Sequence, residues 1–200
     1  AYVIVESMGF DPARDPQRFE EVLSAILEAE LATDAVIAQS DAQREALWRV
    51  RDASGELRHC FWPHVMFDVS VPVGDLGTFA EELITSLRYR WPEVQTALFG
   101  HAADANIHIG VKVGDGEQPE SQIEQLVYAV VARWSGSISA EHGIGLLKRA
   151  YLGLTRSAAE IEVMRVIRNA LDPRGILNPG KIFVPRNVDS DDAPPDTSRQ

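Results

Sequence analysis

The segment 106–113 constrains the fold more than any other part of the chain, because its side chains alternate strictly in character. Isoleucine or valine stands at every odd position, and Asn106, His108, Gly110 and Lys112 stand between them. This period of two is typical of a β-strand that has one face against a core. His108 is therefore predicted to point away from the core, onto the opposite face.

A second histidine requires a turn just before this strand. His101 lies seven residues before His108, so one unbroken strand would send the two side chains to opposite faces. We predict that 95–100 forms the first strand of a hairpin and that 102–105 forms its turn. Two imidazoles at the open end of a hairpin can converge on one point, which is the geometry that a metal ion needs.

Size and composition indicate a globular chain with one domain or two fused subdomains. Two hundred residues with 45% hydrophobic content can bury a sizeable core. No apolar run has the length of a membrane span, and no signal peptide is recognisable. The single cysteine, Cys60, fits a reducing compartment, so we expect a cytoplasmic protein. A net charge of −11 without a basic cluster argues against nucleic acid as a partner.

The two ends of the chain predict different things. The first residue is not methionine, and the apolar run 2–6 follows it directly. We therefore expect a fragment of a longer protein that was cut at a domain boundary. Residues 187–200 are acidic, contain prolines and lack apolar periodicity. They are predicted to form a flexible tail.

Periodicity and capping signals predict alternating strands and helices. Helices are expected after the capping residues Asp15, Ser40 and Ser157, over 76–90, and in the stretch that ends at Gly136. The predicted strands are 2–6, 35–38, 65–71, 95–100, 106–113 and 137–140.

This order of elements predicts an α+β fold. We expect an antiparallel or mixed sheet covered by helices, built as two ferredoxin-like βαβ-type units, with a C-terminal helical segment. A doubly wound parallel sheet is the alternative. The chain has neither a Gly-x-Gly-x-x-Gly after a strand nor a Walker loop, so it carries no nucleotide-binding fingerprint of its own.

Glu141 and His142, which follow the last predicted strand, complete a candidate site. Glu141 lies two residues after Ser139 and four after Ser137, so alternation places it on the same, polar side as these two serines. With His101 and His108 it would supply two neutral nitrogens and one carboxylate. This set suits Zn²⁺, Mn²⁺ or Fe²⁺ and leaves positions open for a substrate. His142 could stand close to the ion without binding it and act as a general base.

Other interpretations of the same residues stay open. A sheet histidine is often a satisfied hydrogen-bonding residue, and 141–145 could be a tight turn that needs small residues. The same ligands would also suit a metal-dependent hydrolase, which activates water. A non-catalytic binding or assembly domain is the third candidate.

Five blocks of sequence carry a resemblance to one known family. They include Gly-His-Ala-Ala-Asp-Ala-Asn-Ile-His at 100–108, Ser-Ala-Glu-His-Gly-Ile-Gly at 139–145 followed by Lys148, and Leu-Asn-Pro-Gly-Lys-Ile-Phe at 177–183, with 47–52 and 67–72 before them. The chain resembles the C-terminal domain of FAD-linked oxidases of the vanillyl-alcohol-oxidase type. It resembles especially the branch with D-lactate dehydrogenase, glycolate oxidase and D-2-hydroxyglutarate dehydrogenase.

This resemblance implies a domain arrangement and a reaction. Residues 1–186 would form a substrate cap domain, and a separate N-terminal domain, absent from this chain, would hold FAD. The reaction implied is oxidation of a 2-hydroxy acid similar to D-lactate or glycolate, to the 2-oxo acid, by hydride transfer to FAD. This chain alone would be inactive. The electron acceptor and a homodimeric state are left open.

The resemblance also assigns roles to individual residues. It implies that the histidines at 101 and 108 and Glu141 bind a divalent metal, Zn²⁺ or Mn²⁺ with Fe²⁺ as an alternative, and that His142 is the base. Arg51 would grip a substrate carboxylate, a role that suits a planar bidentate donor. Its structural alternative is a solvent-facing helix residue. Asn178 would contact the cofactor.

Three departures from the family pattern bear on the substrate. Ala103 and Ala105 replace two glycines of the hairpin turn, and alanine disfavours positive φ. Met66 stands where a lysine is common, so a second acidic group on the substrate would lose a cation. Gly110 replaces a frequent asparagine. We therefore expect a smaller or more apolar 2-hydroxy acid than 2-hydroxyglutarate.

Overall fold

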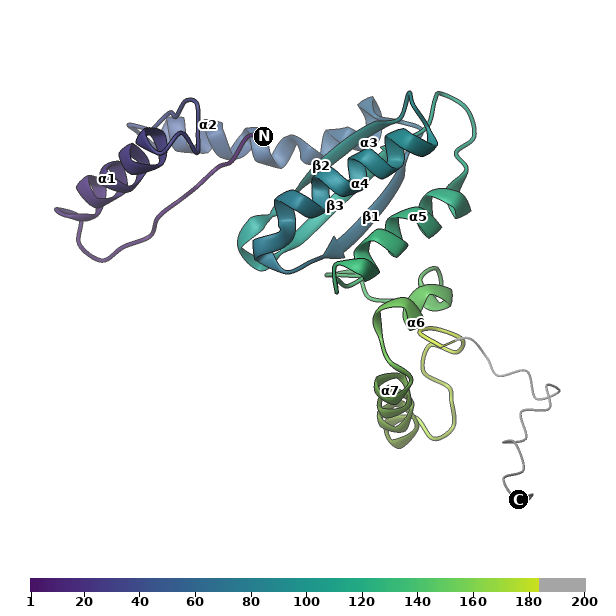
Figure 1. Cartoon of the computed structure of the whole chain (residues 1–200). Helices are drawn as coiled ribbons and strands as arrows, with labels where there is room; N and C mark the ends of the chain where they lie inside the picture. The colour runs from purple at the N-terminus through teal and green to yellow at the C-terminus, as the bar shows by residue number, and fades with distance from the viewer. Residues whose placement is uncertain (184–200) are drawn as a thin grey trace, which may run out of the picture. The chain divides into compact units, whose positions relative to one another are not determined.

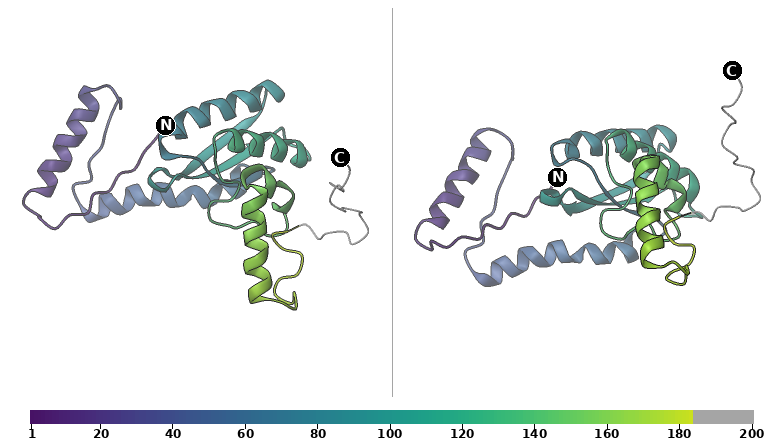
Figure 2. Two further views of the ribbon diagram at one scale, coloured as in Figure 1. Left: turned by 60° about the horizontal axis from the view of Figure 1, so that its bottom comes forward. Right: turned by 90° about the horizontal axis from the view of Figure 1, so that it is seen from below.

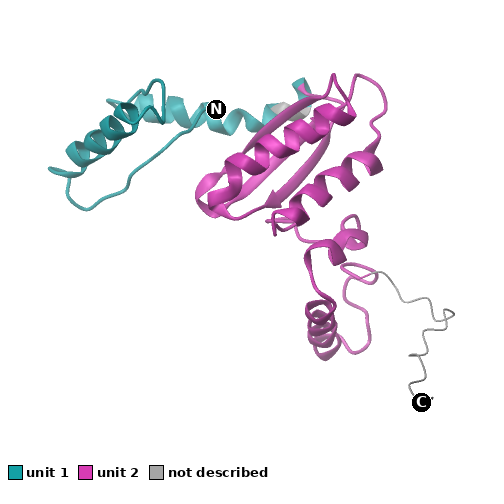
Figure 3. Ribbon diagram, in the orientation of Figure 1, with its two compact units in different colours: residues 1–60 teal, residues 61–200 magenta. Residues whose placement is uncertain are grey.

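The structure is a computed structural model that describes residues 1–183, apart from the side chains of Leu57 and Arg58. The predicted acidic tail at 187–200 lies outside the described residues. The chain divides into two compact units, Ala1–Cys60 and Phe61–Gln200, which are coloured separately in Figure 3.

The first unit is helical. It contains α1 (Asp15–Glu28), α2 (Asp41–Asp52), the 3₁₀ turn η1 (Ala53–Glu56) and the short α3 (Leu57–Cys60). Ser40 caps α2 as predicted, because its hydroxyl accepts the backbone N–H of Gln43 at 3.3 Å. The cap predicted at Asp15 was wrong by one residue, since Asp15 lies inside α1 and Arg14 is its N-cap.

The strands predicted at 2–6 and 35–38 are not formed. Both segments have neither helical nor strand structure and no ladder partner, and the apolar side chains of 2–5 are exposed to solvent. A strand is stable only when its backbone groups pair with a neighbour and one face is covered. The apolar pattern at 2–6 therefore did not suffice to make a strand in this unit.

The second unit is built around a three-stranded antiparallel sheet. Its strands are β1 (Val65–Ser70), β2 (Gln95–His101) and β3 (Asn106–Lys112), in the order β1-β3-β2. The helices α4 (Leu76–Arg90) and α5 (Glu120–Arg133) cover the same face, as Figures 1 and 2 show. The predicted α+β class is confirmed.

A fourth segment extends this sheet at the β1 edge. The predicted strand at 137–140 is reduced to one antiparallel bridge, in which Ser137 exchanges two backbone hydrogen bonds with Ser70. With this bridge the second unit has the β-α-β-β-α-β order that we expected for a ferredoxin-like unit. The 3₁₀ turns η2 (Val73–Asp75) and η3 (Ala102–Asp104) complete its connections.

Strand register decides which side chains enter the core. Phe67 of β1 lies opposite Ile109 of β3, and both side chains are buried under the helices. Apolar residues at a helical period supply the other side of this core. They are Phe79, Leu83 and Leu87 from α4, and Ile123, Val127 and Val131 from α5.

The C-terminal part of the described chain is helical, as predicted. It contains η4 (Arg149–Tyr151), α6 (Leu152–Thr155) and α7 (Ala158–Leu171). Ser157 and Glu160 form the predicted capping box, with both reciprocal hydrogen bonds present. Among residues 1–183, no helix combines the length and the apolar character that a membrane crossing would require.

One ion pair ties the two covering helices together and yields a test of this layer. We predict that Glu82→Gln lowers the free energy of unfolding at pH 7 by about 0.5–1 kcal/mol, a range reduced for partial solvent exposure. The reason is that the Glu82 carboxylate accepts hydrogen bonds from Arg133 Nε at 3.1 Å and from Trp134 Nε1 at 2.7 Å. Urea unfolding would measure the difference.

The Glu82–Arg133 pair also makes the free energy of unfolding depend on pH. Hydrogen bonds from Arg133 and Trp134 lower the pKa of Glu82 from its ordinary 4.5. The ionised Glu82 carboxylate therefore contributes fully to the free energy of unfolding above pH 4.5. This contribution is lost as the pH falls through the lower pKa of Glu82 in the folded state. The stability difference between wild type and Glu82→Gln should shrink at pH 3. The exposed neighbour in Glu81→Gln is the control, and an equal effect of both variants would contradict the prediction.

Candidate functional site

The predicted hairpin brings both histidines onto one face. His101 lies opposite Asn106 and His108 lies opposite Phe99 across β2 and β3. Cross-strand partners share a face, and so do residues two apart on one strand. Both imidazoles therefore project from the face that α4 and α5 leave uncovered. The turn between them is η3, at the place that the sequence predicted.

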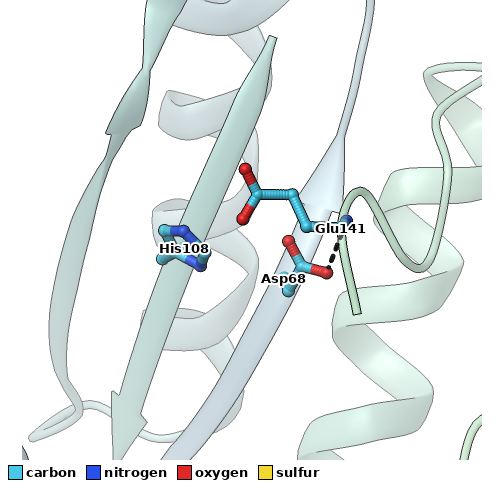
Figure 4. A group of neighbouring side chains, drawn as sticks. All are labelled: Asp68, His108 and Glu141. Atoms are coloured by element: carbon cyan, nitrogen blue, oxygen red, sulfur yellow. Dashed lines mark hydrogen bonds between the residues drawn. The ribbon is translucent and has the colours of Figure 1, made fainter. Parts of the chain in front are cut away.

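A carboxylate from the neighbouring strand joins this face. Asp68 of β1 lies directly opposite His108 of β3, and Glu141 follows the segment that is bridged to β1. One ligand atom from each of these three residues lies within 4.8 Å of the other two. Figure 4 shows the two carboxylates and the imidazole turned toward one another. Asp68 is 2% exposed, His108 is half-buried and Glu141 is exposed.

The structure brings together two of the three metal ligands that the sequence suggested. His108 and Glu141 meet, and the third member of the group is Asp68. His101 is on the same face one cross-strand pair further along, at the end of β2, and it is exposed.

The turn that carries Glu141 and His142 is held by Asp68. Oδ2 of Asp68 accepts the backbone N–H groups of Glu141 and His142, both at 2.9 Å. The two glycines that follow, Gly143 and Gly145, have φ of 74° and 56°, a left-handed conformation that favours glycine. The backbone thus bends at 141–142 and needs glycine at 143 and 145, and this structural requirement is compatible with a functional role.

His142 lies beside this group. Its Nδ1 is 3.7 Å from Oδ2 of Asp68, and its ring centroid is 6.0 Å from that of His108. Its side chain is 66% exposed, so the ring is accessible from solvent. An accessible imidazole beside a carboxylate can accept a proton from a nearby group.

The charge of Asp68 is supported despite its burial. Burial by itself would raise the pKa of Asp68, but hydrogen bonds from the backbone of His142 and Glu141 and the nearby His142 and Lys148 lower it overall. Lys148 donates to Ser139 Oγ at 3.1 Å and lies 4.0 Å from Asp68 Oδ2. Burial lowers the pKa of Lys148 and outweighs the attraction of Asp68.

Several polar atoms of this face lack partners. Among the described residues, Oδ1 of Asp68 and both amide atoms of Asn106 are buried without a hydrogen bond. Such atoms in a native fold commonly mark the place of a water, an ion or a ligand. Their position on the face of His108 fits a bound polar group.

The surface next to this group is apolar. Phe99 packs against the His108 ring at 5.2 Å between centroids. Gly110 lies opposite Met66, and a Cβ placed on Gly110 would come within 3.2 Å of Met66 Sδ and of the Phe61 ring. The glycine therefore makes room for these two side chains. A polar side chain at 110 would displace them.

The other two predicted site residues lie in different parts of the chain. Arg51 belongs to α2 in the first unit, and its guanidinium is 3.2 Å from the Asp52 carboxylate. Asn178 follows α7, and its Oδ1 accepts from Lys181 Nζ at 2.8 Å. Arg168 donates to the backbone carbonyls of Leu177, Asn178 and Lys181, which fixes this loop.

Sequence reasoning missed Asp68. The signal was present, since a carboxylate stands in the middle of the apolar strand 65–71 and alternation places it on the face away from Phe67. A charge at such a position is costly unless it is paired. What the sequence could not supply was its partner across the sheet.

Comparison with known proteins shows the family of this chain. A family described as FAD linked oxidases, C-terminal domain, matches residues 1–182. The chain is 38% identical over 188 residues to a D-2-hydroxyglutarate dehydrogenase of Xanthomonas citri, an alignment that covers 91% of this chain and 39% of the relative. It is 35% identical over 181 residues to the enzyme of that name from Stutzerimonas stutzeri, covering 86% and 39%.

A relative with another printed name is similar to nearly the same extent. A putative mitochondrial D-lactate dehydrogenase of Schizosaccharomyces pombe is 33% identical over 190 residues, covering 90% of this chain and 36% of the relative. The chain thus spans less than two fifths of the length of these curated relatives.

The hairpin turn gives a prediction that separates its two alanines. Ala105 has φ of 64°, whereas Ala103 lies within the 3₁₀ turn. We expect Ala105→Gly to be more stable than Ala103→Gly by about 1 kcal/mol, because glycine relieves a left-handed backbone only at 105. Thermal or urea unfolding of the two variants measures this difference. Equal stabilities, or a reversed order, would contradict it.

Proposed function

Since this chain belongs to the family of C-terminal domains of FAD-linked oxidases, we propose that it is the substrate- and metal-binding domain of a flavin-dependent dehydrogenase. The proposed reaction oxidises a 2-hydroxy acid to the 2-oxo acid. In this proposal the flavin is held mainly by a separate FAD-binding domain, and Asn178 contacts it from this chain.

The observation that carries the proposal is the meeting of His108 and Glu141 at one point of an uncovered sheet face. The donor set fits a divalent cation, because an imidazole nitrogen and carboxylate oxygens suit Zn²⁺, Mn²⁺ and Fe²⁺. A buried carboxylate oxygen without a hydrogen bond also lies in this group. We propose His108 and Glu141 as ligands, with His101 as a further donor from the same face.

The residues around this point divide the work of the reaction. When bound, a divalent cation favours the alkoxide form of the substrate hydroxyl, and a flavin accepts the hydride equivalent from C2. His142 accepts the hydroxyl proton in our proposal, and Asp68, 3.7 Å from its Nδ1, stabilises the imidazolium that results. Arg51 is proposed to pair with the substrate carboxylate, a role suited to its planar guanidinium.

The apolar surface beside the group suggests the substrate. Met66, Gly110 and Phe61 adjoin the Asp68 and His108 pair on the same face. Lys112 lies two residues after Gly110 on the same face of β3, and its Nζ is 2.7 Å from the Asp115 carboxylate. A second substrate carboxylate would thus meet apolar side chains and a lysine that is already paired. We propose a small or apolar 2-hydroxy acid such as D-lactate or glycolate.

Metal titration of the chain tests the site. We expect Zn²⁺ or Mn²⁺ to bind with one ion per chain in calorimetry, and His108→Ala to weaken binding at least about 100-fold, because an inner ligand is lost. His59→Ala, at an exposed position in the first unit, is the control and should bind as wild type. Equal binding by both variants, or no binding by wild type, would refute the metal site and favour a non-catalytic domain.

Flavin reduction tests the substrate class. In the flavin-loaded full-length protein we expect a higher kcat/KM for D-lactate or glycolate than for D-2-hydroxyglutarate. Met66→Lys should shift this ratio toward the diacid by about tenfold, which corresponds to about 1.4 kcal/mol. Tyr89→Lys adds the same charge at a position that is 92% exposed on α4 and should leave the ratio unchanged. Preference of the wild type for the diacid would overturn the assignment.

The metal-dependent hydrolase alternative makes a different prediction with the same ligands. It requires activity without flavin, since a cation and water suffice for hydrolysis. Substrate-dependent bleaching of the flavin in the full-length protein would therefore decide for the dehydrogenase.

A further inference from the structure

The two oxygens of the Asp68 carboxylate have different surroundings. We infer that Asp68 is itself a ligand of the proposed cation, through Oδ1, while its Oδ2 positions Glu141 and His142. This inference rests on the proposed metal site and adds to it a residue that neither the motifs nor the comparisons single out.

Oδ2 is fully used by the protein. It accepts the backbone N–H groups of Glu141 and His142 at 2.9 Å each, and Ser139 Oγ lies at 3.5 Å. These bonds fix the backbone from which the Glu141 carboxylate and the His142 ring project. Asp68 thereby sets the position of a proposed ligand and of the proposed base at once.

Oδ1 has no such partner. Within the described part of the chain this oxygen is buried and accepts no hydrogen bond. The whole residue is only 2% exposed. Figure 4 shows this oxygen on the side of the Glu141 carboxylate, opposite the dashed bond to the backbone of Glu141. A buried carboxylate oxygen without a donor is costly, and a second carboxylate facing it adds repulsion.

A divalent cation resolves both difficulties. It would pair with Oδ1 and would screen the two carboxylates from each other. The distances permit this, since one ligand atom each of Asp68, His108 and Glu141 lies within 4.8 Å of the others. Water alone would satisfy the hydrogen bond but would leave the repulsion between the carboxylates.

The added carboxylate makes the donor set richer in oxygen. Carboxylate oxygen is the ligand type that suits Mn²⁺, whereas imidazole suits Zn²⁺. Loss of Asp68 as a ligand should therefore weaken Mn²⁺ binding more than Zn²⁺ binding. A role in positioning alone predicts no such difference between the two metals.

Asp68→Asn separates the two roles. The amide carbonyl oxygen can still accept from the backbone N–H groups, but the anionic ligand is lost. We expect the dissociation constant for Mn²⁺ to rise at least about 30-fold, as the loss of residues around metal sites commonly weakens binding. The dissociation constant for Zn²⁺ should rise less. Calorimetric titration of each metal measures both.

Asp172→Asn is the matched control. Asp172 is also a buried aspartate, 8% exposed, and its carboxylate oxygens accept the backbone N–H groups of Ile176 and Leu177 at 3.0 and 2.8 Å. It is not among the described residues that gather at the metal site. This variant should bind both metals as the wild type does.

The outcomes separate this inference from the proposed function. Weak metal binding by His108→Ala together with wild-type binding by Asp68→Asn would overturn the inference and leave the proposed site standing. Wild-type binding by His108→Ala would overturn the proposed site first. If Asp68→Asn fails to fold, crystals of the Zn²⁺-loaded wild type decide. Anomalous scattering should place the ion about 2.0–2.2 Å from Oδ1, and an ion beyond about 3.5 Å would refute the inference.

Discussion

The site depends on the register between β1 and β3, which places Asp68 directly opposite His108. Because side chains alternate between the faces of a strand, a shift of one residue would move Asp68 into the core and Phe67 out of it. Burial of Phe67, Val69 and Ile109 under the helices prevents that shift. The hydrophobic core on one face therefore fixes the polar constellation on the other.

A single carboxylate then links the sheet to the turn after it. The segment 137–140 is attached to β1 by one bridge and by the hydrogen bond from the Ala140 N–H to the Asp68 carbonyl, a weak connection by itself. The hydrogen bonds from the backbone of Glu141 and His142 to Asp68 add a second attachment where the chemistry is proposed. Local turn structure and proposed function share the same residues, so the structural and the functional interpretation of 141–145 do not compete.

The uncovered face also combines two kinds of surface. Charged and polar groups gather around His108, and the next cross-strand pair, Met66 and Gly110, is apolar. A 2-hydroxy acid has the same division, with its hydroxyl and carboxylate at one end and its substituent at the other. The match between this division and the small apolar substituent of lactate is the basis of the proposed substrate class, even though relatives are named for the diacid 2-hydroxyglutarate.

Features that depend on local period and local caps could be predicted from the amino-acid sequence. It predicted the hairpin with its turn at 102–105, the face of His108, the α+β class and the capping box of Ser157, because each follows from residues close together in the chain. The meeting of Asp68 with His108 and Glu141, and the absence of a strand at 2–6, became known only from the folded chain. Pairing across a sheet joins residues far apart in the chain, and its register is set by burial of the whole core rather than by any one segment.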